Sequence, residues 1–221
     1  MNWFALAALG GVVGVDATSF AQTMVSRPFI AATTAGLIAG RPQEGAMLGA
    51  ILELFALVIL PVGAARYPES GTAAVAASAA YMSTTAILSP AVMLLAVLFA
   101  LVWERIAGYS VILDRRFNEQ FVALAPVGSP RELERRHVAA IAVDFVRATL
   151  LTMVGWLVGT VALRSLAELW SMSASVAPAI LSIGVSCMIG AALPLFGGLH
   201  ARKVALLIGV VLGSLIVVAM R

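Results

Sequence analysis

The chain has 221 residues, of which 62% are hydrophobic and only 11% are charged, and its net charge is +3. A soluble domain is nearer half apolar and a quarter charged, so a mean hydropathy of +1.03 excludes an ordinary soluble protein and indicates a polytopic, all-α membrane protein. The small net charge gives no sign of nucleic-acid binding. With a single cysteine, Cys187, the chain forms no internal disulfide.

The first two apolar segments are broken or short. Residues 3–24 form the first segment, which we expect to be a retained membrane segment, and Asp16 is the one charged residue in it. Residues 28–40 follow, and as a helix they would span only about 20 Å at 1.5 Å per residue. A hydrocarbon core is about 30 Å thick. The sequence therefore predicts a re-entrant or broken helix here, with Pro28 at its first position.

The next stretch combines small-residue patterns with a lone carboxylate. GxxxG patterns occupy 36–40 and 45–49, a spacing that lets helices approach closely in lipid. Residues 45–60 form an apolar run with Glu53 near its middle, and a Pro-Val-Gly break over 61–63 ends it. A carboxylate inside such a run is costly and needs a reason. Polar residues beside broken, undersized segments point to the binding site of a transporter.

The middle of the chain changes from small residues to a polar interval. Residues 71–88 are small and polar for a lipid-facing helix, so we expect them to face other protein. A strongly apolar run over 91–103 precedes the one long polar interval, 104–137, which holds six of the fourteen basic residues. Because arginine-rich short intervals mark cytoplasmic loops, we predict that this interval is cytoplasmic. It is either a topogenic loop only or a docking surface for a cytoplasmic partner.

The second half is apolar with few charges, in runs over 138–163, 176–196 and 204–220. Asp144 and Arg147 stand three residues apart in the first run, and we interpret them as a local ion pair on one helix face. Residues 178–194 loosely echo 28–42, with proline at each end and glycines between, which hints at an inverted internal repeat.

The chain is therefore expected to be a single membrane domain over 1–221. Its first helical half is 1–103, its charged interval 104–137 and its second half 138–221. It contains no HExxH, CxxC, GxxxxGK[ST] or GxSxG motif. We accordingly predict no catalytic residue, metal or cofactor, and a subunit that is not itself an enzyme.

Several short runs resemble the IIC subunit of the mannose/fructose/sorbose family of sugar phosphotransferase systems (PTS). They are QTMVSRP over 22–28, GLIAGRPQEGAMLGA over 36–50, LEL over 52–54, PVGAA over 61–65 and the Pro68-Glu69 pair. The resemblance implies a multi-pass subunit that moves a hexose-type sugar across the bacterial inner membrane. It implies a IID membrane partner, cytoplasmic IIB and IIA components, of which IIB phosphorylates the sugar, and an oligomeric complex. One departure is Arg41, where many members have an acid.

Five residues are the candidates for binding the sugar. Glu53 and Gln22 are the first choices, because carboxylates and amides form paired hydrogen bonds with vicinal hydroxyls. Asp16, Arg27 and Glu69 are second choices. Arg27 could equally pair with Glu53 or Asp16, so that neither is an isolated charge in the bilayer, and Asp16 and Glu69 could lie at the interface. Two other functions stay open: a non-transporting scaffold or regulatory subunit, and a proton-coupled sugar carrier.

Overall fold

The computed structural model describes residues 2–57, 68–85, 89–123, 129–170 and 175–198, with 203–204, 207–208 and 211. Within these residues the chain is helical and has no strand, as predicted. The elements are α1 (Trp3–Thr18), α2 (Pro28–Ile38), α3 (Pro42–Ala56), α4 (Ser70–Thr84), α5 (Pro90–Ala123), α6 (Pro130–Leu169), α7 (Val176–Ala192) and a 3-10 turn, η1 (Leu193–Phe196). The predicted break at 61–63 and most of the predicted run 204–220 lie outside the described residues.

Three of the described helices are long and apolar enough to cross a membrane. They run over Pro90–Phe121, Pro130–Leu169 and Val176–Leu195. The helices α1 and α2 are apolar but shorter. The membrane-protein class predicted from composition is thus confirmed by the helices themselves.

The helices α2 and α3 form a tight hairpin of undersized helices, as the short segment 28–40 predicted. With 11 and 15 residues they are about 16 and 22 Å long, too short to cross a bilayer separately. The turn between them contains Gly40 in a left-handed conformation, with φ +75°. A Cβ added at Gly45 would lie 2.5 Å from the carbonyl oxygen of Ala32, and one at Gly36 would lie 3.0 Å from the Cα of Gly45. The GxxxG glycines therefore serve close packing within one hairpin.

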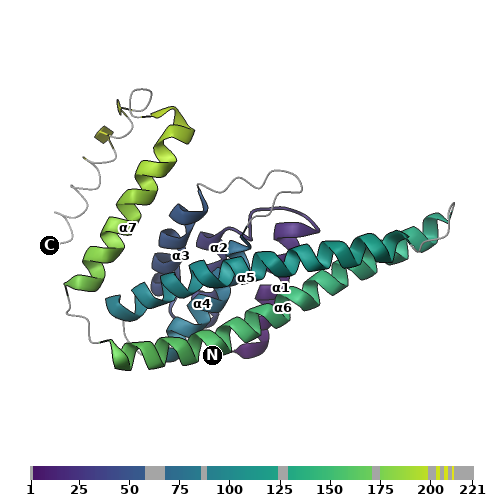
Figure 1. Ribbon diagram of the computed structural model, residues 1–221, viewed down its shortest axis with the longest axis horizontal. Helices are drawn as coiled ribbons and strands as arrows, with labels where there is room; N and C mark the ends of the chain where they lie inside the picture. The colour runs from purple at the N-terminus through teal and green to yellow at the C-terminus, as the bar shows by residue number, and fades with distance from the viewer. Residues whose placement is uncertain are drawn as a thin grey trace.

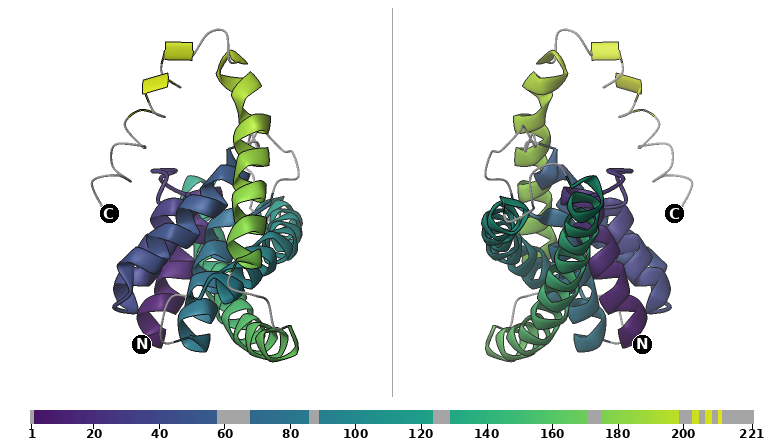
Figure 2. Two further views of the ribbon diagram at one scale, coloured as in Figure 1. Left: turned by 90° about the vertical axis from the view of Figure 1, so that its left-hand side faces the viewer. Right: turned by 90° about the vertical axis from the view of Figure 1, so that its right-hand side faces the viewer.

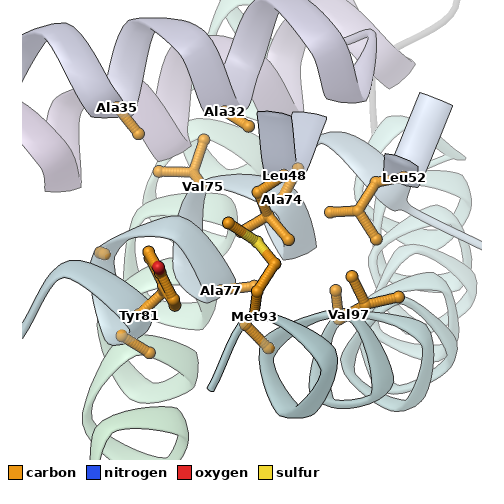
Figure 3. Packing of buried hydrophobic residues seen from close by; sticks show 14 of the residues in the cluster. Ala32, Ala35, Leu48, Leu52, Ala74, Val75, Ala77, Tyr81, Met93 and Val97 are labelled. Atoms are coloured by element: carbon orange, nitrogen blue, oxygen red, sulfur yellow. The ribbon is translucent and has the colours of Figure 1, made fainter. Parts of the chain in front are cut away.

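The helix α4 lies at the centre of the bundle. Every residue from Gly71 to Tyr81 is buried, which confirms that this small-residue segment faces other protein. Alanines of α2, leucines of α3 and Met93 and Val97 of α5 belong to one buried cluster with Val75 and Tyr81 of α4 (Figure 3). Small side chains on α4 let helices approach it from several sides, as is usual where helices pack in lipid.

The helices α5 and α6 are much longer than the apolar runs that predicted them. At 34 and 40 residues they are about 51 and 60 Å long. The interval 104–137 thus belongs largely to the same two helices as the flanking apolar runs, because charged residues on exposed faces do not interrupt a helix. In Figure 1 the two helices run side by side past the rest of the bundle. We call residues 105–123 and 130–146 the arm.

The helix α7 lies at the opposite end of the molecule from the arm (Figures 1 and 2) and packs against α3 and α5. It contains most of the segment that echoes 28–42, but the two segments fold differently. Residues 28–42 contain α2 and a turn, whereas 178–194 run through α7 into the 3-10 turn. The inverted repeat and the division into two halves therefore stay predictions.

Candidate functional site

The loop over 19–27, between α1 and α2, is held in place by Asp16. Its carboxylate accepts hydrogen bonds from the Thr23 amide at 2.6 Å, the Thr23 hydroxyl at 2.7 Å and the Ser26 amide at 2.9 Å. The Asp16 residue is only 5% exposed. Its oxygens are thus committed to the loop backbone, and Asp16 shapes the loop from within the bundle.

Gln22 lies in the most strained part of this loop. Ala21, Gln22 and Met24 all have positive φ values, of 73°, 51° and 68°. Side-chain-bearing residues adopt this conformation at a free-energy cost, and such positions concentrate at binding sites. Gln22 is exposed, so its side-chain amide is available to a ligand.

Arg27 pairs with Glu53, which settles the choice of partner that the sequence left open. The Arg27 Nε donates to the Glu53 Oε1 at 2.6 Å, and the Phe29 amide donates to Oε2 at 3.1 Å. Glu53 therefore caps the first turn of α2 as well as neutralising Arg27. The two side chains remain 33% and 22% exposed.

This pair retains hydrogen-bonding capacity. A guanidinium has five N–H donors and a carboxylate has about four lone-pair positions, more than the described contacts use. The hydroxyl groups of a polyol could therefore accept hydrogen bonds from Arg27 and donate hydrogen bonds to Glu53 at adjacent positions. The arrangement suits an uncharged sugar, because the two opposite charges already compensate each other.

Glu69 belongs to a second, buried cluster. Its side chain is fully buried and accepts from two guanidinium nitrogens of Arg147, at 2.9 and 3.2 Å. Arg147 also donates to Asp144 at 2.7 and 2.9 Å and to the Ser110 hydroxyl at 2.7 Å. The predicted Asp144–Arg147 pair is present, but it is part of a network and not a local surface pair.

The buried network reaches the start of the strained loop. The hydroxyls of Thr18 and Ser19 donate to Asp144, and Ser19 is the first residue of the loop. A Cβ added at Gly14 would touch Ala148 and lie 3.3 Å from Glu69. The network therefore connects α1, α4, α5 and α6 directly behind the loop that carries Gln22.

The described contacts thus sort the five sequence candidates into two groups. Arg27 and Glu53 are in contact, and Gln22 belongs to the loop that Asp16 holds. Glu69 is instead bound to Arg147, and no described contact connects its side chain to Glu53. Sequence reasoning missed Ser110, Thr18 and Ser19, since a hydroxyl residue near a helix end is too common to be a signal.

A separate cavity of about 420 Å³ lies between α3, α5 and α7. Its lining is almost wholly apolar and consists of Met47, Ala50, Ile51, Leu54, Pro90, Met93, Pro178, Leu181, Ser182 and Val185. Sugar hydroxyls would lose their hydrogen bonds to water here without replacement. The described residues also contain no cluster of His, Cys, Asp and Glu that could hold a metal ion.

Comparison with known proteins gives one family. The model of the PTS system sorbose-specific IIC component matches residues 2–201. The sorbose-specific EIIC component of Klebsiella pneumoniae is 51% identical over 49 residues, 22% of this chain and 18% of that protein. The sorbose-specific EIIC component of Lacticaseibacillus casei is 37% identical over 71 residues, 32% of this chain and 23% of that protein. Each alignment thus covers less than a quarter of the relative's own length.

Proposed function

This chain belongs to the family of PTS sorbose-specific IIC components, and from that premise we propose that it binds a hexose-type sugar and passes it across the bacterial inner membrane. It works with a IID membrane subunit, and cytoplasmic IIB and IIA components carry the phosphoryl group that the sugar receives. The two relatives are named for sorbose, which is itself a hexose, so hexoses are the sugar class to test first.

The observation that supports this function is the Arg27–Glu53 pair beside the strained loop. In this proposal Glu53 accepts hydrogen bonds from sugar hydroxyls, Arg27 donates to them and Gln22 does both. Asp16 and Glu69 act as positioning residues. Asp16 holds the loop backbone, and Glu69 anchors Arg147 behind it.

The test is uptake by cells that lack their own hexose phosphotransferase systems and express this chain with IID, IIB and IIA. A panel of labelled hexoses is supplied, and the intracellular sugar phosphate is measured. We expect one or a few hexoses to appear as phosphate esters, and omission of this chain to abolish the product.

Two results would contradict the proposal. Uptake that persists without phosphoenolpyruvate but disappears with the proton gradient would identify a proton-coupled carrier. Sugar phosphate that forms equally well without this chain would make it a scaffold or regulatory subunit.

A further inference from the structure

In the buried network, Asp144 is the second carboxylate on a guanidinium that already has one. Glu69 accepts from two nitrogens of Arg147, at 2.9 and 3.2 Å, and this pair alone is neutral. Asp144 is fully buried, and its Oδ1 accepts from the same guanidinium at 2.7 and 2.9 Å. Burial of a charge is costly unless it is compensated. Asp144 therefore needs a reason beyond its pairing with Arg147.

The other carboxylate oxygen of Asp144 supplies that reason. Its Oδ2 accepts hydrogen bonds from the hydroxyls of Thr18 and Ser19, which are 126 and 125 residues away in the chain. Thr18 is the last residue of α1, and Ser19 is the first residue of the strained loop. Hydrogen bonds to an ionised acceptor are about twice as strong as neutral ones. Asp144 thus fixes, from α6, the point at which the loop leaves α1.

The strained loop has a second attachment further along. The carboxylate of Asp16 accepts from the amides of Thr23 and Ser26, at 2.6 and 2.9 Å. Between the two attachments lie Ala21 and Gln22, with φ values of 73° and 51°. Side-chain-bearing residues persist at positive φ only where the surrounding structure over-determines their conformation. The backbone conformation at Gln22 therefore depends on both attachments.

We propose that Asp144, acting through Thr18 and Ser19, is a positioning residue for sugar binding: it holds the strained loop in the conformation that presents Gln22 to the sugar. Asp144 is buried and does not itself touch the sugar. This inference rests on the proposed function, in which Gln22 forms hydrogen bonds with the sugar. When the attachment is lost, the loop adopts other conformations, and the apparent affinity falls in proportion to the fraction that stays competent. Saturating sugar restores the competent conformation.

The test removes the two hydroxyls and leaves the ion pairs of the network in place. The hydroxyl-free variant is Thr18→Val, Ser19→Ala, and the hydroxyl-retaining variant is Thr18→Ser, Ser19→Thr. Uptake of a transported hexose is measured over a range of concentrations in cells with the complete system. For the hydroxyl-free variant we expect the half-saturating concentration to rise about tenfold or more, because a hydrogen bond to a charged group is worth at least that factor. The maximal rate per molecule should change little, and the hydroxyl-retaining variant should behave like the wild type.

A matched control separates this effect from the loss of a threonine hydroxyl in general. Thr160 and Thr18 both donate to the carbonyl four residues earlier, at 2.7 and 2.8 Å, but no described hydrogen bond connects Thr160 to the loop. Thr160→Val should therefore leave the half-saturating concentration unchanged.

A double-mutant cycle tests whether the attachment acts through Gln22. Gln22→Ala alone should raise the half-saturating concentration. Adding the hydroxyl-free change to Gln22→Ala should then produce little further rise, whereas independent effects would multiply.

Amide hydrogen exchange gives a readout that does not depend on transport. The full chain with its IID partner is placed in lipid nanodiscs, and exchange is followed over residues 20–26. We expect faster exchange in the hydroxyl-free variant than in the wild type and the hydroxyl-retaining variant, because local opening of the loop becomes easier.

The outcomes separate this inference from the proposed function. If sugar phosphate forms and the hydroxyl-free variant keeps the wild-type half-saturating concentration, the positioning role is overturned and the function stands. Multiplying effects in the cycle, an equal loss in the hydroxyl-retaining variant, or unchanged exchange in the loop would also overturn it. If the complete wild-type system forms no sugar phosphate from any hexose, the function fails. The positioning role then fails with it, and faster exchange would mean only that the hydroxyls stabilise the loop.

Discussion

At the residue scale, the Arg27–Glu53 pair combines a structural role with an accessible one. Glu53 caps α2 and neutralises Arg27, so its presence in an apolar run has a structural explanation. Both side chains are nevertheless partly exposed, unlike Glu69 and Asp144, which are buried. A substitution of Glu53 that can still cap α2 but removes the negative charge distinguishes the structural role from sugar binding.

We expect Glu53→Gln to keep normal membrane abundance and to reduce sugar uptake about tenfold to a hundredfold. The single amide oxygen of glutamine can still accept from Arg27 or Phe29, but the NH2 group that replaces the second carboxylate oxygen cannot accept. A hydrogen bond to a charged group contributes about 1.5–3 kcal/mol. Removal of an ionised carboxylate from an apolar run should also ease insertion into the membrane. Abundance and uptake are measured in the same cells, with Glu134→Gln on the exposed arm as the control. Normal uptake at matched abundance would remove Glu53 from the site, and a fall in folded yield would make it a structural charge.

Arg147→Ala is expected to destabilise the protein by about 3–5 kcal/mol. The substitution leaves the buried carboxylates of Glu69 and Asp144 without their cation, and the loss of one partner of a buried ion pair has a cost of this size. The control Arg135→Ala removes an exposed arginine from the arm, and such surface changes usually stay within about 0.5 kcal/mol. The two variants are compared by unfolding in a mild detergent. Equal stabilities would mean that the network is not formed in the membrane.

At the element scale, the α2–α3 hairpin depends on backbone contact. Gly36, Gly45 and Gly49 all lie against backbone atoms of the facing helix, so no flexible side chain can move aside for an added methyl group. The hairpin in turn places the start of α2 beside Glu53 near the end of α3. Its packing therefore determines the geometry of the candidate site.

Gly45→Ala should destabilise the hairpin by about 1–3 kcal/mol, the usual effect of overpacking. Its new Cβ would lie 2.5 Å from the Ala32 carbonyl oxygen. Gly190→Ala is the matched control, because no atom of the described residues lies within 4 Å of the Cβ it would add and alanine favours a helix over glycine. The melting temperature in detergent is the measurement. A lower melting temperature for Gly190→Ala than for Gly45→Ala would contradict the close contact between α2 and α3 at Gly45.

At the scale of the whole molecule, the arm defines one end. The buried network, the strained loop and the Arg27–Glu53 pair are connected to the helices from which it extends, and α7 lies at the other end (Figure 1). In the proposed function the phosphoryl donor is cytoplasmic, so the side of the membrane on which the arm lies tests that proposal.

The interval 104–137, which makes up most of the arm, is predicted to be cytoplasmic because it contains the densest cluster of arginines in the chain. Replacing the exposed Cys187 by serine gives a background for single cysteines at Asn118 or Ser129. An impermeant thiol reagent added to intact cells should leave both unlabelled, and permeabilised cells should show labelling at both. Labelling from outside intact cells would place this interval on the outer side of the membrane and contradict the prediction.

The sequence by itself was sufficient to predict the membrane class, the undersized helices of the hairpin, the protein-facing helix α4 and the family. These features depend on composition and on local spacing, which a single segment contains in full. The unusual position of Glu53 was also visible, since an isolated carboxylate in an apolar run stands out without any structure.

Only the tertiary structure decided which charges are paired. Arg27 and Glu53 are 26 residues apart, and Glu69 and Arg147 are 78 apart, so their contacts depend on how the helices pack and not on spacing along one helix. The structure also decided that α5 and α6 continue through the polar interval as an arm. A charged helical surface and a charged loop have the same composition, and the packing of Ala107 and Val111 on one face with Tyr109 and Leu113 on the other distinguishes them.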